Sequence, residues 1–279
     1  MKTMRFNYQP LRILLVGLLT LSIFCGIIFR TIQLFCAIDY QTGFYKEWNF
    51  SLPALDITLF TATIVIFILV FFLKRVPIFT GVSKRGVGIS LLSLLCAAGM
   101  IGQMILQILQ TQSWSILMLI SVVLSSVSFF CFLILGIREF LSHSGSGTSL
   151  FRNTTVTLWC CAEMLWVFFD HSSKSNTSEY VFVILFLYFA TLFFVKFGKL
   201  AFYDSPTYAS TFSLFASSSL MSLFGFVLSV PNIIAGCCGI ASWQSLSPFS
   251  CVAFPFAIYG LFFVCSNCLN LSQNKRLNI

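Results

Sequence analysis

ALDITLFTATIVIFILVFFLKRVPIFTGVSKR, residues 54–85, is the stretch that decides the fold of this chain. Its first part, 54–73, is apolar over the length that a helix needs to cross the hydrocarbon core of a bilayer, about 20 residues. Basic residues follow at once, at 74–75 and again at 84–85. Because cytoplasmic loops hold an excess of Lys and Arg, this stretch predicts a membrane-spanning helix that ends on the inside.

Similar apolar runs can be marked along the whole chain. They cover 13–37, 54–73, 86–109, 114–136, 154–169, 180–201, 208–230 and 246–266. The basic residues fall almost only in alternate gaps: before the first run and after the second, fourth, sixth and eighth. Continuous apolar runs favour helices, because barrel strands would alternate polar and apolar residues. The sequence therefore predicts an all-α, polytopic integral membrane helical bundle with about eight transmembrane helices and both termini cytoplasmic.

The composition agrees with a membrane protein. Hydrophobic residues make up 58% of the chain and charged residues only 9%, which is too little polar surface to cover a soluble protein. The gaps are too short for a soluble domain, so residues 1–279 are expected to form a single transmembrane domain. The net charge of +8 is assigned to the cytoplasmic gaps. There, bases such as Arg138 and Arg152 are expected to meet anionic lipid headgroups and not nucleic acid.

The fifth run is the least certain crossing, since 154–169 is near the lower length limit and contains Glu163. If it did not cross, the later basic gaps would face outward, against the positive-inside rule. We therefore count it as a crossing. In the runs that follow, Pro231 is expected to end the seventh helix and Pro248 to lie in the first turn of the eighth.

Glu163 is the leading candidate for a functional residue. An acid near the middle of a membrane helix costs about 2.5–3.5 kcal/mol to insert on the translocon scale, so a function or a partner must offset that cost. One interpretation is a neutral carboxyl hydrogen-bonded to a neighbouring helix. The other is a proton or cation site.

A row of amides supplies the second candidate feature. Gln103, Gln107 and Gln110 stand at spacings of four and three, so they share one face of the third helix. This row is either a polar seam between helices or one wall of a water-accessible cavity open to the outside. The second interpretation predicts a polar pocket of Arg30, Asp56, Gln103, Gln107, Gln110 and Glu163. Considered separately, Arg30 is expected to extend to the outer headgroups, or else to pair with Asp56 or Glu163.

Catalytic and metal-binding patterns are not found. His143 and His171 are the only histidines, Cys265 and Cys268 form a lone CxxC, and GxSxG, HExxH and glycine-rich phosphate loops do not occur. We therefore expect no cofactor, no metal and no enzymatic activity.

One short pattern supports a resemblance. Arg30, Gln33, Asp39 and then Thr42-Gly43-Phe44-Tyr45 follow one another across the end of the first run and the gap after it. This order resembles multi-pass membrane proteins of clostridia-like Gram-positive bacteria, a group to which no activity is attached. The resemblance implies a multi-pass protein of the bacterial cytoplasmic membrane and carries no catalytic residues.

Three classes of function are left open. The first is a non-enzymatic accessory, sensor or assembly subunit, whose partners are the lipid bilayer and another membrane protein. The alternative is a small-solute permease or substrate-binding membrane component that uses the outward polar pocket. A membrane enzyme acting on lipid comes third, since no acid, base or metal group for it is recognisable.

Overall fold

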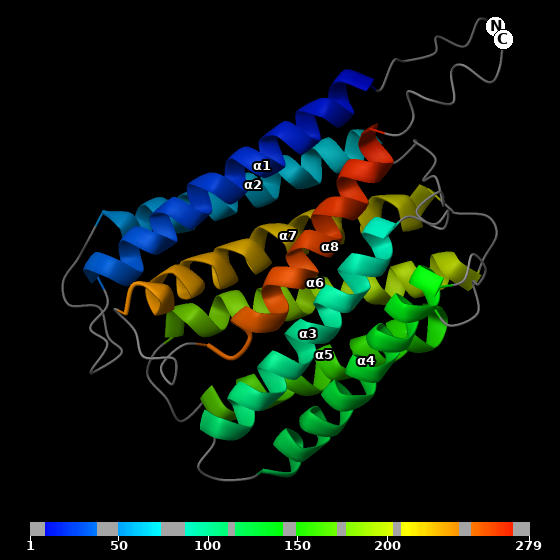
Figure 1. Ribbon diagram of the computed structural model, residues 1–279. Coiled ribbons are helices and arrows are strands. Elements are labelled where there is room, and N and C mark those ends of the chain that lie inside the picture. The colour runs from blue at the N-terminus through cyan, green and yellow to red at the C-terminus, as the bar shows by residue number, and fades with distance from the viewer. Residues whose placement is uncertain are drawn as a thin grey trace, which may run out of the picture.

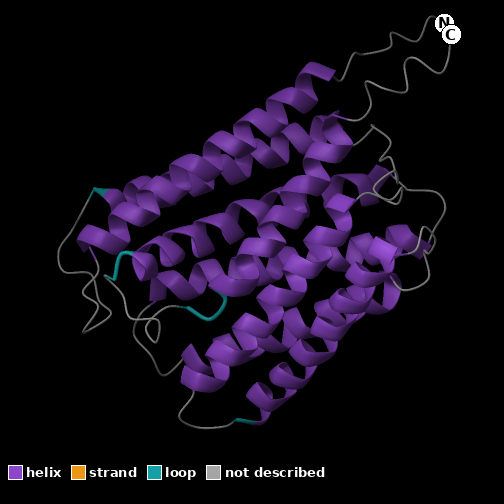
Figure 2. Ribbon diagram, viewed as in Figure 1, coloured by secondary structure: helices purple, strands orange, loops and turns teal. Residues whose placement is uncertain are grey.

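The computed structural model describes residues 9–37, 50–73, 87–110, 115–141, 149–171, 177–202, 208–239 and 247–269. Across these ranges the chain is helical and contains no strand (Figure 2). The helices are α1 Gln9–Ile32, extended by a π-helix η1 Gln33–Ala37, then α2 Ser51–Leu73, α3 Val87–Gln110, α4 Ile116–Leu141, α5 Ser149–His171, α6 Thr177–Phe202, α7 Tyr208–Cys237 and α8 Ser250–Leu269. The predicted all-α polytopic bundle is confirmed. Asp39 and residues 42–45, which carry most of the resemblance, lie outside the described ranges.

The fifth helix is longer than predicted, Ser149–His171 instead of 154–169. Its 23 residues rise about 34 Å, enough to cross the hydrocarbon core. The sequence prediction omitted its first turn because Arg152 and Asn153 are polar. Both are buried in the structure, with 3% and 1% of their surface exposed. The expectation that Arg152 meets lipid headgroups is therefore wrong, because the first turn of α5 directs its side chain into the bundle.

The seventh helix does not end at Pro231 but continues to Cys237. A membrane helix tolerates an internal proline where neighbouring groups compensate for the lost backbone hydrogen bond. One residue later, the Asn232 side-chain amide donates to Glu179 of α6 at 2.9 Å and to Ser250 of α8 at 3.1 Å. These bonds hold the end of α7 between two other helices.

The eighth helix begins later than predicted, at Ser250 and not at 246. Pro248 lies in the turn that precedes the helix, and its carbonyl accepts a bond from the Cys251 amide at 3.3 Å. The proline therefore lies just before the helix and not in its first turn.

The helices form three groups in space (Figure 1). In the middle, α7 packs against α6 and α8. On one side, α1 and α2 pack against each other and against α7. On the other side, α4 packs between α3 and α5, which in turn contact α8 and α6. The start of α1 and the end of α8 lie at the same end of the bundle, as an even number of crossings requires (Figure 1).

Small residues let the central helices approach closely. A Cβ atom placed on Gly260 of α8 would lie 2.6 Å from the Ser222 hydroxyl oxygen and 2.8 Å from the Ser218 carbonyl oxygen, both on α7. A Cβ on Gly225 of α7 would lie 2.9 Å from the Ala253 carbonyl oxygen of α8. Glycine is therefore required on both sides of this contact, as is typical of helix pairs in membranes.

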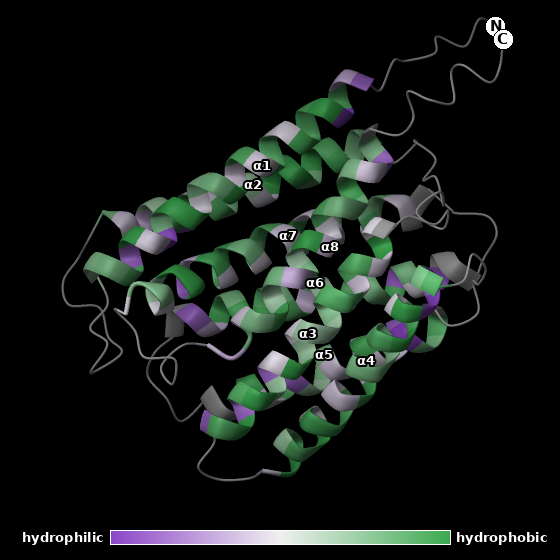
Figure 3. Ribbon diagram, in the orientation of Figure 1, coloured by the Kyte–Doolittle hydropathy of each residue, from purple (hydrophilic) through white to green (hydrophobic). Residues whose placement is uncertain are grey.

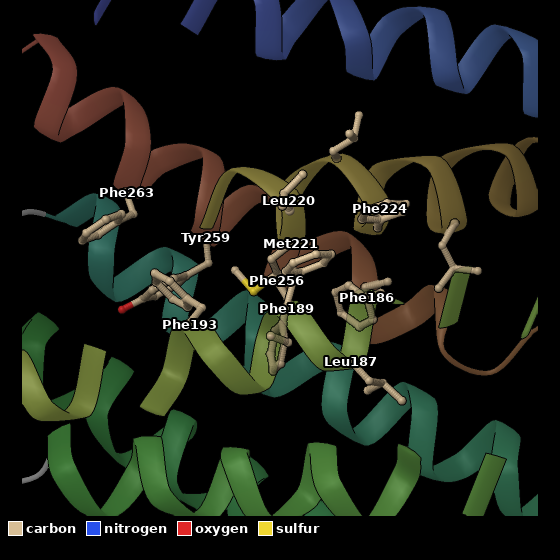
Figure 4. Packing of buried hydrophobic residues seen from close by; sticks show 14 of the residues in the cluster. Phe186, Leu187, Phe189, Phe193, Leu220, Met221, Phe224, Phe256, Tyr259 and Phe263 are labelled. Carbon is tan, nitrogen blue, oxygen red and sulfur yellow. The ribbon is translucent and has the colours of Figure 1, made fainter. Parts of the chain in front are cut away.

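Aromatic side chains fill the space between the central helices (Figure 4). Phe189 of α6 stacks on Phe224 of α7 with ring centroids 5.7 Å apart. Phe193 of α6 meets Phe263 of α8 edge to face at 5.4 Å. Phe256 of α8 contacts rings on α4, α5 and α6. The abundant phenylalanines thus act as packing residues that join the middle group to the α3–α5 group.

The outer faces are apolar, as lipid contact requires (Figure 3). Large apolar side chains such as Phe24 on α1, Phe60 on α2 and Val123 on α4 are more than half exposed. In the described part of the chain, seven helices are long and apolar enough to cross a membrane. The remaining one, α5, is less apolar because it carries Arg152 and Glu163, and it packs between α4 and α6, where these residues face protein.

Candidate functional site

The site is built first from the glutamine face of α3. Gln103 and Gln107 are four residues apart, one helical turn, and both are almost completely buried, with 0% and 1% exposure. The Gln103 amide nitrogen donates to the Gln107 side-chain oxygen at 2.7 Å. Gln110, at the end of α3, is half-buried. The predicted shared face therefore holds for the two inner glutamines, which turn toward α4 and α5.

Glu163 of α5 meets these glutamines with its whole carboxyl group. One oxygen, Oε1, accepts from the Gln103 amide at 2.9 Å, from the Trp159 indole nitrogen at 3.1 Å and from the Ser121 hydroxyl in a short contact. The other oxygen, Oε2, accepts from the Gln107 amide at 3.4 Å. Glu163 has no exposed surface. Four donors from α3, α4 and α5 thus converge on one carboxyl group, and we call these five residues the carboxyl cluster.

Neighbouring groups extend the carboxyl cluster and fix its orientation. Ser125 of α4 lies one turn from Ser121 and donates to the Gln103 side-chain oxygen at 3.3 Å. Trp159, one turn before Glu163 on α5, meets Phe256 of α8 edge to face with centroids 6.1 Å apart. The hydrogen bonds connect α3, α4 and α5. The Trp159 ring packs these helices against α8 of the central group.

The electrostatics of the carboxyl cluster rest on neutral donors. Among the described residues, no Lys or Arg nitrogen comes within 4 Å of Glu163. An ionised carboxylate at this buried position is stabilised by hydrogen bonds that favour the charged form. A neutral carboxyl would also fit, because the Ser121 hydroxyl can accept as well as donate. The cluster can therefore hold a carboxylate or a proton without a counter-ion.

Arg30 lies elsewhere, at the outer end of α1. It is 2% exposed, and its Nη1 donates to the Gln33 side-chain oxygen at 3.0 Å. Its guanidinium carbon lies 5.3 Å from the ring centroid of Phe182 on α6. Asp56 of α2 is exposed to the surroundings and, among the described residues, forms no ion pair with Arg30.

The six residues of the predicted polar pocket lie in two parts of the bundle. The structure brings Gln103, Gln107 and Glu163 together between α3, α4 and α5. It places Arg30 on α1 and Asp56 on α2, across the central group from α3, α4 and α5 (Figure 1), with Arg30 in contact with Phe182 of the central helix α6. That all six residues, Gln110 among them, line one pocket stays a prediction.

The structure contains a third buried polar group, around Arg152, that the sequence analysis did not predict. Arg152 of α5 lies over the rings of Phe132, Phe197 and Tyr259, with its guanidinium carbon 5.5–6.0 Å from their centroids. Its Nε donates to the Asn153 side-chain oxygen at 3.2 Å, and its Nη2 donates to the Tyr259 hydroxyl at 3.5 Å. These cation–π contacts stabilise a guanidinium that has no carboxylate within 4 Å among the described residues.

The signal for Arg152 was present in the spacing of α5. Arg152, Val156, Trp159 and Glu163 follow at intervals of four, three and four and are all buried. They therefore form one helical face. Extending that face toward the N-terminus from Glu163 predicts that Arg152 is buried. The sequence prediction did not include Arg152, because it began the fifth helix at residue 154.

Metal ligands do not gather in the described part of the chain, where no group of three His, Cys, Asp or Glu side chains comes together. No protein-family model, curated protein or solved structure matches this chain. The chemistry of the three polar groups is therefore the basis for a functional proposal.

Proposed function

We propose that this protein is a non-enzymatic accessory, sensor or assembly subunit of a bacterial cytoplasmic membrane. The observation that carries the proposal is the closed hydrogen bonding of the carboxyl cluster. Gln103, Gln107 and Glu163 direct their polar atoms at one another and at Ser121 and Trp159. Such a cluster fixes the relative positions of α3, α4 and α5.

A permease site has a different requirement, because the solute must find polar atoms that the protein leaves available. In the carboxyl cluster the Glu163 oxygens already accept four bonds, and no member is more than 1% exposed. Polar residues that bond across helices act in membrane proteins as links between them. This favours the seam interpretation of the glutamine row over the outward cavity.

The sequence adds a reason to propose a partner. The gaps between the predicted crossings are too short to fold into a soluble catalytic or recognition domain. A protein of this kind acts through its membrane-embedded surface, on lipid or on another membrane protein.

The first experiment tests whether water reaches the carboxyl cluster. In a background where exposed Cys36, Cys237 and Cys238 are replaced by Ser, Ser121→Cys is compared with Gln110→Cys in intact membranes. We expect a small hydrophilic maleimide to label Gln110→Cys and to leave Ser121→Cys unmodified. Comparable labelling rates would show a water-lined site, and the alternative, a small-solute permease with an outward-facing polar pocket, would then be the better account.

The second experiment tests the partner. The protein is expressed at its native level, extracted in mild detergent and weighed by native mass spectrometry. We expect a complex heavier than the 31.3 kDa chain that contains one other membrane protein at fixed stoichiometry. A stable monomer that retains a bound small solute would contradict the proposal.

A further inference from the structure

The outer end of α1 contains a buried cation whose hydrogen bonding is incomplete. Arg30 is 2% exposed, and among the described residues its Nη2 atom has no hydrogen-bond partner. Within the same part of the chain, Nη1 donates to Gln33 and the guanidinium contacts the ring of Phe182. An unmet donor on a buried charged group is destabilising, so this arrangement indicates a missing acceptor.

The other buried guanidinium shows what a completed environment looks like. Arg152 donates to two residues and lies over three rings. Arg30 has one bond and one ring. Since both lie in the same bundle, the difference is a property of the outer end of α1 and not of buried arginines in this fold.

A helix N-terminus adds to the positive potential at Arg30. The Gln33 amide donates to the backbone carbonyl of Ser51 at 2.9 Å, and Ser51 is the first residue of the 23-residue α2. Gln33 therefore joins Arg30 to the start of α2. Helix N-termini attract anions through the positive end of the helix dipole. At Gln33 the chain also changes from α-helix to the π-helix η1, a distortion that is frequent at functional sites.

We propose that Arg30 and the N-terminus of α2 bind a phosphoryl anion, the phosphodiester of a lipid headgroup or free phosphate. Guanidinium groups recognise phosphoryl oxygens through paired N–H donors. Ile28, Ile32 and Phe35 of α1 and η1 are exposed by 39–41%. They lie on the outward face of this segment, where acyl chains can pack, whereas Arg30 faces the bundle. This inference goes beyond the proposed subunit role and does not depend on it.

Two carboxyl groups belong to the helices that surround Arg30. Asp56 of α2 is exposed, and its carboxyl group interacts electrostatically with Arg30. Glu179 of α6 stands one turn before Phe182, and its carboxylate accepts from Asn232. Among the described residues neither carboxylate pairs with Arg30 within 4 Å. Removing either negative charge should therefore strengthen anion binding.

The test uses the full-length protein in maltoside detergent, which contains no phosphate. Inorganic phosphate is added in one series and phosphatidylglycerol in another, with diacylglycerol of the same chains as the neutral control. Thermal unfolding followed by tryptophan fluorescence gives an apparent Kd, because a ligand that binds only the native state raises its stability with concentration. Native mass spectrometry gives the stoichiometry.

We expect saturable stabilisation with one bound anion per chain. Arg30→Gln should raise the apparent Kd at least tenfold, and the matched control Arg152→Gln should leave it unchanged. A response to phosphatidylglycerol alone identifies a lipid headgroup, a response to phosphate alone identifies a free anion, and a response to both identifies the phosphoryl group itself. The proposal is overturned if neither anion exceeds the neutral control, or if the response persists in Arg30→Gln.

A second variant keeps the test decisive if Arg30→Gln does not fold. Asp56→Asn removes an exposed charge and leaves every hydrogen bond of Arg30 intact. It should lower the apparent Kd several-fold. An unchanged or higher Kd in Asp56→Asn would contradict the placement of the anion beside Arg30.

Discussion

Replacing Glu163 by Gln tests the carboxyl cluster most directly. The three donors at Oε1 can all be retained by an amide oxygen, which leaves the new NH₂ group at the position of Oε2. There it faces the Gln107 amide nitrogen, which donated to Oε2 at 3.4 Å. One bond is lost and two donors oppose each other. Interhelical hydrogen bonds in membrane proteins average about 0.6 kcal/mol with a maximum near 1.7, so we expect Glu163→Gln to cost about 1–2 kcal/mol.

Replacing Glu163 by Leu removes the acceptor for all four donors. Gln103 keeps its bond to Gln107 at 2.7 Å, and the Ser121 hydroxyl can turn to a carbonyl of its own helix. The Trp159 indole and the Gln107 amide are left without an acceptor from Glu163. At about 1–3 kcal/mol for each unmet buried donor, Glu163→Leu should cost roughly twice as much as Glu163→Gln or more.

An exchange of the two side chains provides the rescue. In the double variant Gln107→Glu with Glu163→Gln, the amide at 163 donates to the carboxylate at 107 and still accepts from Trp159 and Ser121. Gln107→Glu alone places two carboxyl groups side by side and should be the least stable of the set. The double variant should therefore be more stable than the sum of the single changes by more than 1 kcal/mol, a coupling expected of residues in contact.

The assay is reversible unfolding in mixed micelles of increasing SDS fraction, followed by tryptophan fluorescence for the wild type and all four variants. If Glu163→Gln does not destabilise the protein, or if the exchange shows no coupling, the carboxyl cluster does not hold α3 and α5 together. The seam interpretation would then have no energetic support.

Two further predictions concern packing and the second buried cation. Gly260→Val should lower the free energy of unfolding by more than about 2 kcal/mol in the same assay, because its Cβ would lie 2.6 Å from the Ser222 hydroxyl. The control Gly17→Val, where a Cβ meets nothing within 4 Å, should lower it by less than about 1 kcal/mol. Equal losses would contradict the close approach of α7 and α8. Tyr259→Phe should cost under about 1 kcal/mol, because it removes only the 3.5 Å bond to Arg152 and keeps the ring beneath the guanidinium; a loss as large as that of Arg152→Leu would show that the hydroxyl and not the ring stabilises this cation.

The positions of the helices were largely predictable because the membrane imposes a minimum apolar length on every crossing. The errors lie where side chains override composition. The predicted fifth helix was too short because Arg152 and Asn153 are polar. In the structure, aromatic rings and neighbouring helices bury both side chains. The seventh helix was predicted to end at Pro231. The hydrogen bonds of Asn232 to α6 and α8 could not be foreseen, because they depend on which helices are neighbours.

The candidate site was predictable only within single helices. The spacing of Gln103 and Gln107 places them on one face of α3 without knowledge of the fold. Their contact with Glu163 depends on α3, α4 and α5 being neighbours, and apolar surfaces of similar composition do not specify the order in which helices pack. For the same reason the sequence could not separate Arg30 from Glu163, since both were simply polar residues toward the same side of the membrane.

Among the described residues, the buried side chains of Arg30, Arg152 and Glu163 are stabilised by different means, and the differences indicate where a ligand acts. Glu163 is surrounded by four neutral donors and Arg152 by three rings and two acceptors. Because a buried charge with a complete set of partners loses those partners when a solute displaces them, these two groups favour a fixed structure. Arg30 retains an unmet donor, so an anion that binds there gains an interaction without breaking one. The carboxyl cluster and the Arg152 environment therefore stabilise the bundle, and the outer end of α1 is the place where binding can change it.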